Sequence, residues 1–196
     1  MDEKEIEEMF EFTRDLARKC GEMVKTAFYL PKEVVTKSSA VDLVTETDQK
    51  VEKTIIEAIK KKYENHEIIG EESTAAGKPV ILTDRPTWVI DPVDGTTNFV
   101  CGFPYIAVCI GVMINKVPVV GVVYNPIMDH MYSAIKGKGA TLNEKPLKAN
   151  CNKARITLFR TVGLPIFLPK FCEIWITIGE IWLNSSNSLL DKLDVH

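Results

Sequence analysis

The sequence is poor in the residues that mark disulfide-rich, zinc-binding and nucleic-acid-binding proteins. It has 5 cysteines, 3 histidines and a net charge of −3 over 196 residues. The cysteines are odd in number, widely spaced and never in a Cys-x-x-Cys pair, which favours free thiols in a reducing compartment over disulfides or a zinc site. A mildly acidic chain also disfavours nucleic acid as the main partner, because phosphate backbones bind basic surfaces. A small phosphorylated ligand is not disfavoured, since a bound divalent metal supplies positive charge locally.

Signals for export and for membrane insertion are also missing. Residues 1–8 are acidic and lack the basic and apolar regions of a signal peptide. The most apolar stretch, residues 163–183, contains Pro165 and Pro169 together with charged residues, so it fits a membrane span poorly. We therefore expect a cytoplasmic protein with no membrane partner.

The composition of the whole chain, 45% hydrophobic and 26% charged, is that of a globular protein. Two amphipathic helices are predicted in its first third. Apolar residues recur at three- and four-residue steps over residues 4–28 and again over about 48–63. Pro31 marks the end of the first run, and Thr45 or Thr47 would cap the second.

A hairpin or mobile loop is predicted between these helices. Val34 and Val44 belong to two short extended pieces. The polar connection between the pieces, residues 37–40, begins with Lys37.

The middle of the chain has the pattern of strands. Short apolar runs bounded by Asn, Gly and Pro turn signals indicate strands over residues 68–70, 87–90, 106–113, 117–124, 130–135 and 140–142. Helices first and strands afterwards predict an α+β fold, with helices layered against a largely antiparallel sheet.

The character of the sequence changes near residue 150. The tail, residues 150–196, contains Trp175 and Trp182, and neither the helix nor the strand period holds there for long. We therefore expect one domain over residues 1–149, followed by a poorly ordered tail.

Acidic residues follow two of the predicted strands. Glu71 comes directly after the strand at 68–70, and Asp91 and Asp94 follow the strand at 87–90. Carboxylate oxygens are hard ligands that suit Mg²⁺, which also shares its coordination shell with substrate phosphate and water.

The segment after the second of these strands combines a turn with a helix start. Pro92 fixes its own φ and restricts the residue before it, so we expect a sharp turn there. Gly95 permits a close approach of the backbone to a ligand. Residues 95–98 open what reads as a short helix, whose N–H groups would point at an anion such as phosphate.

A plain turn is the alternative interpretation. Taken alone, an Asp-Pro-x-Asp-Gly run is more often a surface turn than a ligand site. Two carboxylate-bearing strand ends in succession favour the site, because converging like charges repel or become protonated unless a cation lies between them.

Three motifs, taken in order, resemble the inositol monophosphatase family. Trp88-Val-Ile-Asp-Pro-Val-Asp-Gly-Thr-Thr-Asn-Phe99 resembles the first signature of the family. Asp42-Leu-Val-Thr-Glu-Thr-Asp48 and Ile69-Gly-Glu-Glu-Ser73 are similar to its two upstream motifs. The resemblance runs from near residue 5 to about residue 149. It implies an Mg²⁺-dependent phosphoric monoester hydrolase that acts on inositol monophosphate, is sensitive to Li⁺ and forms a homodimer.

The resemblance also implies metal ligands. Glu71, Asp91 and the backbone carbonyl of Val93 would hold one Mg²⁺, and Asp91 and Asp94 would contribute to a second. Glu71 would face a third, looser metal and would belong to the catalytic set.

Further roles follow from the same resemblance. Thr96, paired with Asp48, would orient and deprotonate the attacking water. Asp94 and the backbone N–H groups of Gly95 and Thr96 would bind the substrate phosphate. Lys37 would lie in a mobile loop that closes over the metals; a solvated loop lysine is the alternative.

The later half of the family pattern does not occur in residues 151–196. Its Trp-Asp-x-Ala-Gly motif, whose aspartate completes the second metal site, is absent there, as are the residues that grip the inositol hydroxyls. Two alternatives to the inositol monophosphate phosphatase therefore stay open. One is a catalytically inactive truncation product that binds metal or a full-length partner; the other is a broader sugar-phosphate phosphatase.

Overall fold

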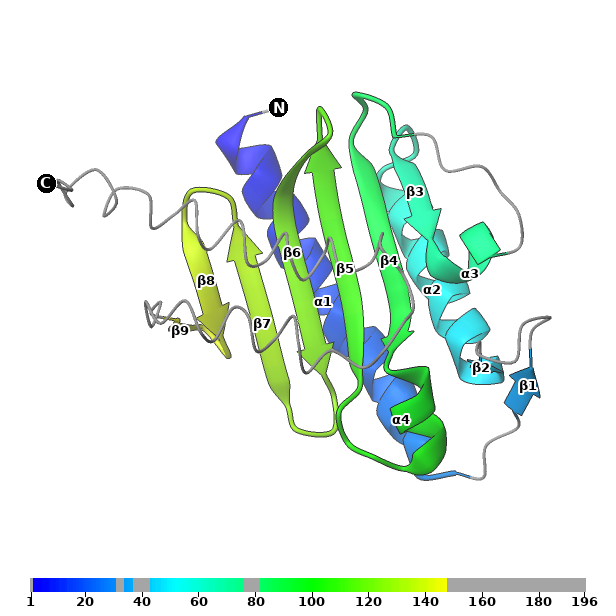
Figure 1. The fold of residues 1–196 in the computed structure, drawn as a ribbon. Helices are drawn as coiled ribbons and strands as arrows, with labels where there is room; N and C mark the ends of the chain where they lie inside the picture. The colour runs from blue at the N-terminus through cyan, green and yellow to red at the C-terminus, as the bar shows by residue number, and fades with distance from the viewer. Residues whose placement is uncertain (1, 31–33, 37–42, 76–81, 148–196) are drawn as a thin grey trace, which may run out of the picture.

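The computed structural model describes residues 2–30, 34–36, 43–75 and 82–147 (Figure 1). Lys37 and the tail at 150–196 lie outside the described residues, so the predictions on them stay predictions. The elements, in chain order, are α1 (Glu3–Phe28), β1 (Val34–Thr36), β2 (Leu43–Thr45), α2 (Glu46–Lys62), β3 (Glu67–Gly70), α3 (Glu71–Ala75), β4 (Thr87–Asp94), α4 (Thr96–Cys101), β5 (Ala107–Ile114), β6 (Val117–Asn125), β7 (His130–Ile135), β8 (Gly139–Leu142) and β9 (Lys145–Pro146).

Seven strands form one sheet in the order β3-β4-β5-β6-β7-β8-β9. Every neighbouring pair is antiparallel except β3 and β4, which run parallel. Strands β1 and β2 pair separately as an antiparallel hairpin. The predicted α+β class and the largely antiparallel sheet are confirmed.

Helices α1 and α2 lie side by side on one face of this sheet (Figure 1). Helix α1 crosses β5, β6 and β7, while α2 packs against β4. Between helices and sheet lies a continuous apolar core. Its largest fully buried side chains include Trp88, Tyr124, Phe99, Met9, Ile55 and Ile59. Because successive strand residues point to opposite faces, a second and smaller apolar cluster of Ala107, Cys109 and Val123 lies within the same strands.

Both long helices begin close to the predicted residues. Helix α1 starts with a capping box, in which the side chains of Asp2 and Glu5 each accept a hydrogen bond from the other residue's backbone N–H. Helix α2 starts at Glu46, two residues before the predicted start. Of the two predicted caps, Thr47 lies inside the first turn and is ruled out, whereas Thr45 directly precedes the helix, so its capping role stays a prediction.

Strand β4 differs from its prediction in a way that matters for function. The strand was expected to stop at Ile90, with a sharp turn at Asp91-Pro92, but it continues to Asp94. Its register with β5 shifts between Asp91 and Asp94. Proline has no backbone N–H to donate to a neighbouring strand, so Pro92 is accommodated by this irregularity instead of ending the strand.

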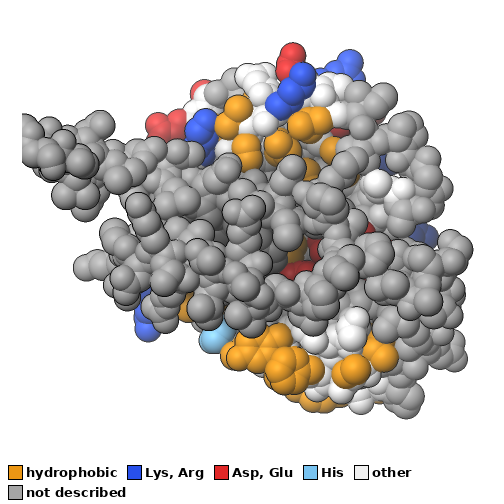
Figure 2. All heavy atoms as spheres, viewed as in Figure 1, with side chains coloured by type: hydrophobic (Ala, Val, Ile, Leu, Met, Phe, Trp, Pro, Cys, Tyr) orange, Lys and Arg blue, Asp and Glu red, His pale blue; other side chains and the backbone are white. Residues whose placement is uncertain are grey.

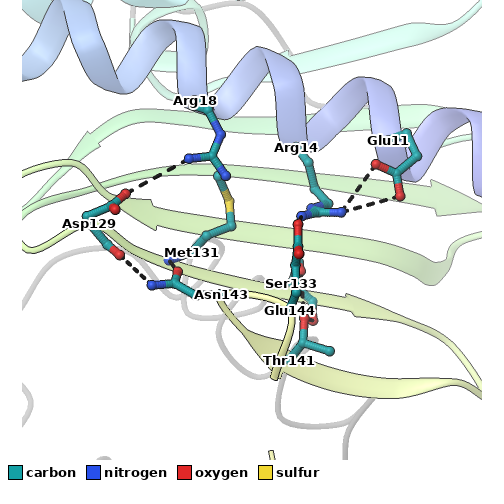
Figure 3. A network of polar contacts seen from close by, with 9 residues as sticks. All are labelled: Glu11, Arg14, Arg18, Asp129, Met131, Ser133, Thr141, Asn143 and Glu144. Atoms are coloured by element: carbon teal, nitrogen blue, oxygen red, sulfur yellow. Dashed lines mark hydrogen bonds and ion pairs between the residues drawn. The ribbon is translucent and has the colours of Figure 1, made fainter. Parts of the chain in front are cut away.

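Arginine side chains on α1 reach across to the β7–β8 end of the sheet (Figure 3). Arg14 forms an ion pair with Glu144 at 2.6 Å, and Arg18 lies 4.0 Å from the carboxylate of Asp129. Asn143 supports this corner, because its side chain bonds the backbone of both Asp129 and Met131. Both acidic partners are exposed, so each pair contributes about 0–1 kcal/mol, and the apolar core stabilises this packing more than the arginines do.

In Figure 2, which views the face of the sheet away from α1 and α2, apolar atoms gather along the lower edge, below the acidic atoms near the middle. Phe103 and Tyr105, in the loop between α4 and β5, are 53% and 59% exposed and stack with ring centroids 5.1 Å apart.

No described helix is long and apolar enough to cross a bilayer.

A histidine anchors the start of β4 to the end of α2. The indole Nε1 of Trp88 donates a hydrogen bond of 3.0 Å to Nδ1 of His66. The imidazole also stacks on Tyr63 with ring centroids 4.8 Å apart. Burial lowers the pKa of His66 from its ordinary value of 6.5. Nδ1 must be unprotonated to accept the indole proton, so the neutral imidazole is the form that fits this site.

We predict that this contact makes the stability pH-dependent. Since the folded-state pKa of His66 is lowered, its contribution is fully present above pH 6.5 and is lost as the pH falls from 6.5 through the folded-state pKa. The free energy of unfolding, measured by urea titration between pH 5 and pH 7.5, should depend less on pH in His66→Phe, which keeps a stacking ring but cannot titrate. Equal pH dependence in the two proteins would contradict the assignment.

Candidate metal centre

Four carboxylates from three elements meet at the end of β4. Asp48 lies in the first turn of α2, Glu71 opens α3, and Asp91 and Asp94 lie on the last residues of β4. The parallel register of β3 and β4 explains the meeting of two of them. The β3–β4 pairing ends with Gly70 opposite Ile90. The next residue on each strand, Glu71 and Asp91, therefore lies at the same end of the two strands.

Asp91 is the most strongly affected of these carboxylates. The residue is only 6% exposed. Burial raises its pKa well above the ordinary value, and the negative charges of Glu71 and Asp94, a hydrogen bond with Glu71 and the charge of Asp48 raise that pKa further. Three carboxylates, two of them from other predicted motifs, are therefore close enough to Asp91 to oppose its ionisation.

The donor atoms in this cluster fit a hard divalent cation. Oδ1 of Asp91 is buried and has no hydrogen-bond partner, which is a costly state for a carboxylate oxygen. A cation bound there would satisfy this oxygen and offset the repulsion among the carboxylates. In the part of the chain that the structure describes, no three Asp, Glu, His or Cys side chains already form a complete metal-binding group. The carboxylates are thus candidate ligands that a bound ion would draw together.

The backbone between Asp94 and Thr96 is shaped by a glycine. Gly95 has φ +88°, in the left-handed region, and caps α4, which begins at Thr96 as predicted. A Cβ atom at this position would lie 2.9 Å from the carbonyl oxygen of Tyr105. The same oxygen accepts a hydrogen bond of 2.8 Å from the side-chain amide of Asn98. The turn therefore needs glycine for its φ and also for its close contact with the neighbouring chain.

Thr96 points its hydroxyl back toward β4. Its Oγ1 lies 3.2 Å from the carbonyl oxygen of Val93 and donates to it. A carbonyl oxygen has two lone pairs, so the carbonyl of Val93 is still able to bind a metal. The predicted pairing of Thr96 with Asp48, and the metal and phosphate roles of these residues, stay predictions.

Two residues near this cluster were not predicted. Cys109 lies opposite Asp91 in the pairing of β4 with β5. Burial raises the pKa of its thiol well above the ordinary value, and the charges of Asp94, Asp91 and Glu71 raise it further. A neutral thiol therefore borders the carboxylates. Glu52 is the second residue, and a sequence signal existed for it, because it lies four residues after Asp48 on a helix face that is otherwise apolar.

Comparisons with known proteins agree with this geometry. Residues 5–163 match the model of the inositol monophosphatase family. Human inositol monophosphatase 1 is 54% identical over 144 residues, which cover 74% of this chain and 52% of that protein. The chain thus spans about half the length of the curated relatives it matches.

Solved structures show the same fold. The Thermotoga maritima IMPase superposes with a TM-score of 0.67 at 28% identity, over 74% of this chain and 55% of that one. SaIMPase-II has been solved with inositol monophosphate bound (TM-score 0.58, 30% identity, 71% of this chain and 48% of that one) and with 2'AMP bound (TM-score 0.59, 30% identity, 71% and 50%).

We predict that Gly95→Ala destabilises the chain more than Gly102→Ala does. Both glycines have positive φ, and that conformation alone costs an alanine about 1–2 kcal/mol. Only at Gly95 would the new methyl group also meet a backbone carbonyl, whereas no atom lies within 4 Å of the Cβ position at Gly102. The expected loss at Gly95 is about 2–4 kcal/mol in urea unfolding. Equal losses in the two variants would show that the contact with Tyr105 is unimportant.

Proposed function

Because the chain belongs to the inositol monophosphatase family, we propose that it binds Mg²⁺ and hydrolyses the phosphate ester of inositol monophosphate. One observation carries the proposal. Asp91 is buried among Glu71, Asp94 and Asp48 with a carboxylate oxygen that no hydrogen bond satisfies. Such a cluster of acidic groups is better suited to a cation than to a purely structural role, in which apolar residues would cost less.

The proposed ligands are oxygen atoms from the start of α3 and the end of β4. Glu71, Asp91 and the carbonyl of Val93 would hold one Mg²⁺, and Asp91 and Asp94 would contribute to a second. Bound Mg²⁺ would lower the pKa of the attacking water and stabilise the charge on the phosphate. Sensitivity to Li⁺ would follow if the second set of ligands is complete.

The remaining proposed roles belong to the turn after β4. The Thr96 hydroxyl lies beside the carbonyl of Val93, and with the carboxylate of Asp48 it would orient the attacking water and receive its proton. The backbone N–H groups of Gly95 and Thr96, together with Asp94, would position the phosphate. Because Gly95 packs tightly against Tyr105, this turn is held in place before any ligand binds, which reduces the entropic cost of binding.

A broader phosphatase is the second candidate. SaIMPase-II has been solved with both inositol monophosphate and 2'AMP, which are phosphate monoesters of different alcohols. The proposed metal ligands would act at the phosphate end of a substrate, so they would not by themselves select the alcohol. A third candidate, retained from the sequence, is a chain that binds metal or a full-length relative without turnover.

We predict that Mg²⁺ stabilises the chain through Asp91. At 100 times its dissociation constant, an ion that binds only the folded state adds about 2.7 kcal/mol to the free energy of unfolding. Burial and three neighbouring carboxylates oppose the ionisation of Asp91. Asp91→Asn, which cannot ionise, should therefore raise the melting temperature in EDTA and abolish the rise caused by Mg²⁺. Asp15→Asn, a change at an exposed position on α1, is the matched control and should behave like the unaltered chain. A full Mg²⁺ response in Asp91→Asn would rule out the proposed ligand.

We predict Mg²⁺-dependent phosphate release from inositol 1-phosphate that Asp91→Asn abolishes. Parallel assays with 2'AMP distinguish the broader phosphatase. Turnover no higher than that of Asp91→Asn would refute catalysis by this chain. If Mg²⁺ still binds in that case, the non-catalytic candidate gains support, and co-expression with a full-length relative followed by size-exclusion chromatography would test pairing.

A further inference from the structure

Glu52 is a buried acidic residue that faces away from solvent yet lies outside the four carboxylates of the metal centre. It is 4% exposed and lies on α2, one turn after Asp48. The charges that raise the pKa of Asp91 are those of Glu71, Asp94 and Asp48, and Glu52 is not among them. Burying a carboxylate is costly, so its hydrogen-bond partners indicate what it does.

The carboxylate of Glu52 binds the turn that joins β3 to α3. Oε2 accepts the backbone N–H of Glu72 at 2.8 Å, and Oε1 accepts the backbone N–H of Ser73 at 3.0 Å. The hydroxyl of Ser73 also donates to Oε1. Three donors from two successive residues thus converge on one carboxylate, and charge-assisted hydrogen bonds of this type are among the stronger ones in proteins.

Gly70 makes room for this arrangement. A Cβ atom at residue 70 would lie 2.6–2.8 Å from the carboxyl carbon and both oxygens of Glu52. The carboxylate therefore rests directly against the backbone of the residue before Glu71, while its hydrogen bonds hold the two residues after Glu71. The backbone of Glu71 is fixed on both sides by a single side chain.

We propose that Glu52 is a positioning residue, which clamps the turn at residues 70–73 and so sets where the Glu71 carboxylate meets Asp91. The proposal rests on the proposed Mg²⁺ site. Helix α2 then serves the site twice, because Asp48 faces the carboxylate cluster and Glu52 holds the segment that carries Glu71. Side chains that support metal ligands in this way typically change metal affinity by 10- to 100-fold when they are altered.

The test compares Glu52→Gln with Glu57→Gln, a change at an exposed position on the same helix. Glutamine keeps the size of the side chain but replaces one acceptor oxygen with an NH₂ donor, which would face a backbone N–H. We expect faster hydrogen exchange of the Glu72 and Ser73 amides in Glu52→Gln, and about 10-fold or greater weakening of Mg²⁺ binding in calorimetry. Exchange in β5 and β6 should stay unchanged, which separates local loosening from general unfolding.

Gly70→Ala tests the clamp from the other side. Its methyl group would displace the Glu52 carboxylate, so this variant should also show faster amide exchange at Glu72 and Ser73 and weaker Mg²⁺ binding. Combining Gly70→Ala with Glu52→Gln should add little to either single change. Ser73→Ala, which leaves both backbone hydrogen bonds, should have a smaller effect on exchange.

The outcomes separate the clamp, the positioning role and the proposed Mg²⁺ site from one another. Unchanged exchange at Glu72 and Ser73 in Glu52→Gln would overturn the clamp. Faster exchange with unchanged Mg²⁺ affinity would overturn the positioning role. If the unaltered chain binds no Mg²⁺, the proposed function fails and the positioning role fails with it, while the exchange data still decide whether the clamp exists.

Discussion

Repulsion among carboxylates at the end of β4 is the constraint on which the rest of the site depends. A buried Asp91 surrounded by three other acidic groups is unfavourable in the absence of a cation, and its raised pKa expresses that cost. A chain tolerates such a cluster only where the surrounding structure is rigid enough to prevent the groups from moving apart. The architecture around β4 meets this requirement through backbone pairing, a tight glycine turn and two contacts from α2.

Strand β4 is secured at both ends of its length. At its start, Trp88 is fully buried and bonds to His66, which follows the end of α2. At its end, Gly95 packs against the carbonyl of Tyr105 and caps α4. The parallel pairing with β3 and the antiparallel pairing with β5 hold the strand between these points. Carboxylates on such a strand are held more rigidly than carboxylates on a free loop.

Helix α2 links the core to the site. Val51, Ile55 and Ile59 bury one face of the helix in the core, and Asp48 and Glu52 extend the same buried surface toward the carboxylates and the β3–α3 turn. A shift of this helix would therefore move Asp48 directly and Glu71 through its neighbours. Stability of the core and geometry of the site are coupled through one helix, which explains why polar residues are found on a face that packing alone would make apolar.

The sequence by itself determined the two long helices, the main strands, the α+β class and the family, because hydrophobic periods, turn residues and the Asp91-Pro-Val-Asp94 motif are local signals. It did not predict the short helix α3 or the two-residue strand β9. It also identified Asp48, Glu71, Asp91 and Asp94 as candidates. Only the tertiary structure decided that these four meet, since that depends on the parallel register of β3 and β4 and on the placement of α2. The continuation of β4 through Pro92 and the hydrogen-bond partners of Glu52 also depend on the tertiary structure. The first requires knowledge of which strand lies alongside, and the second join residues 20 and 21 positions apart.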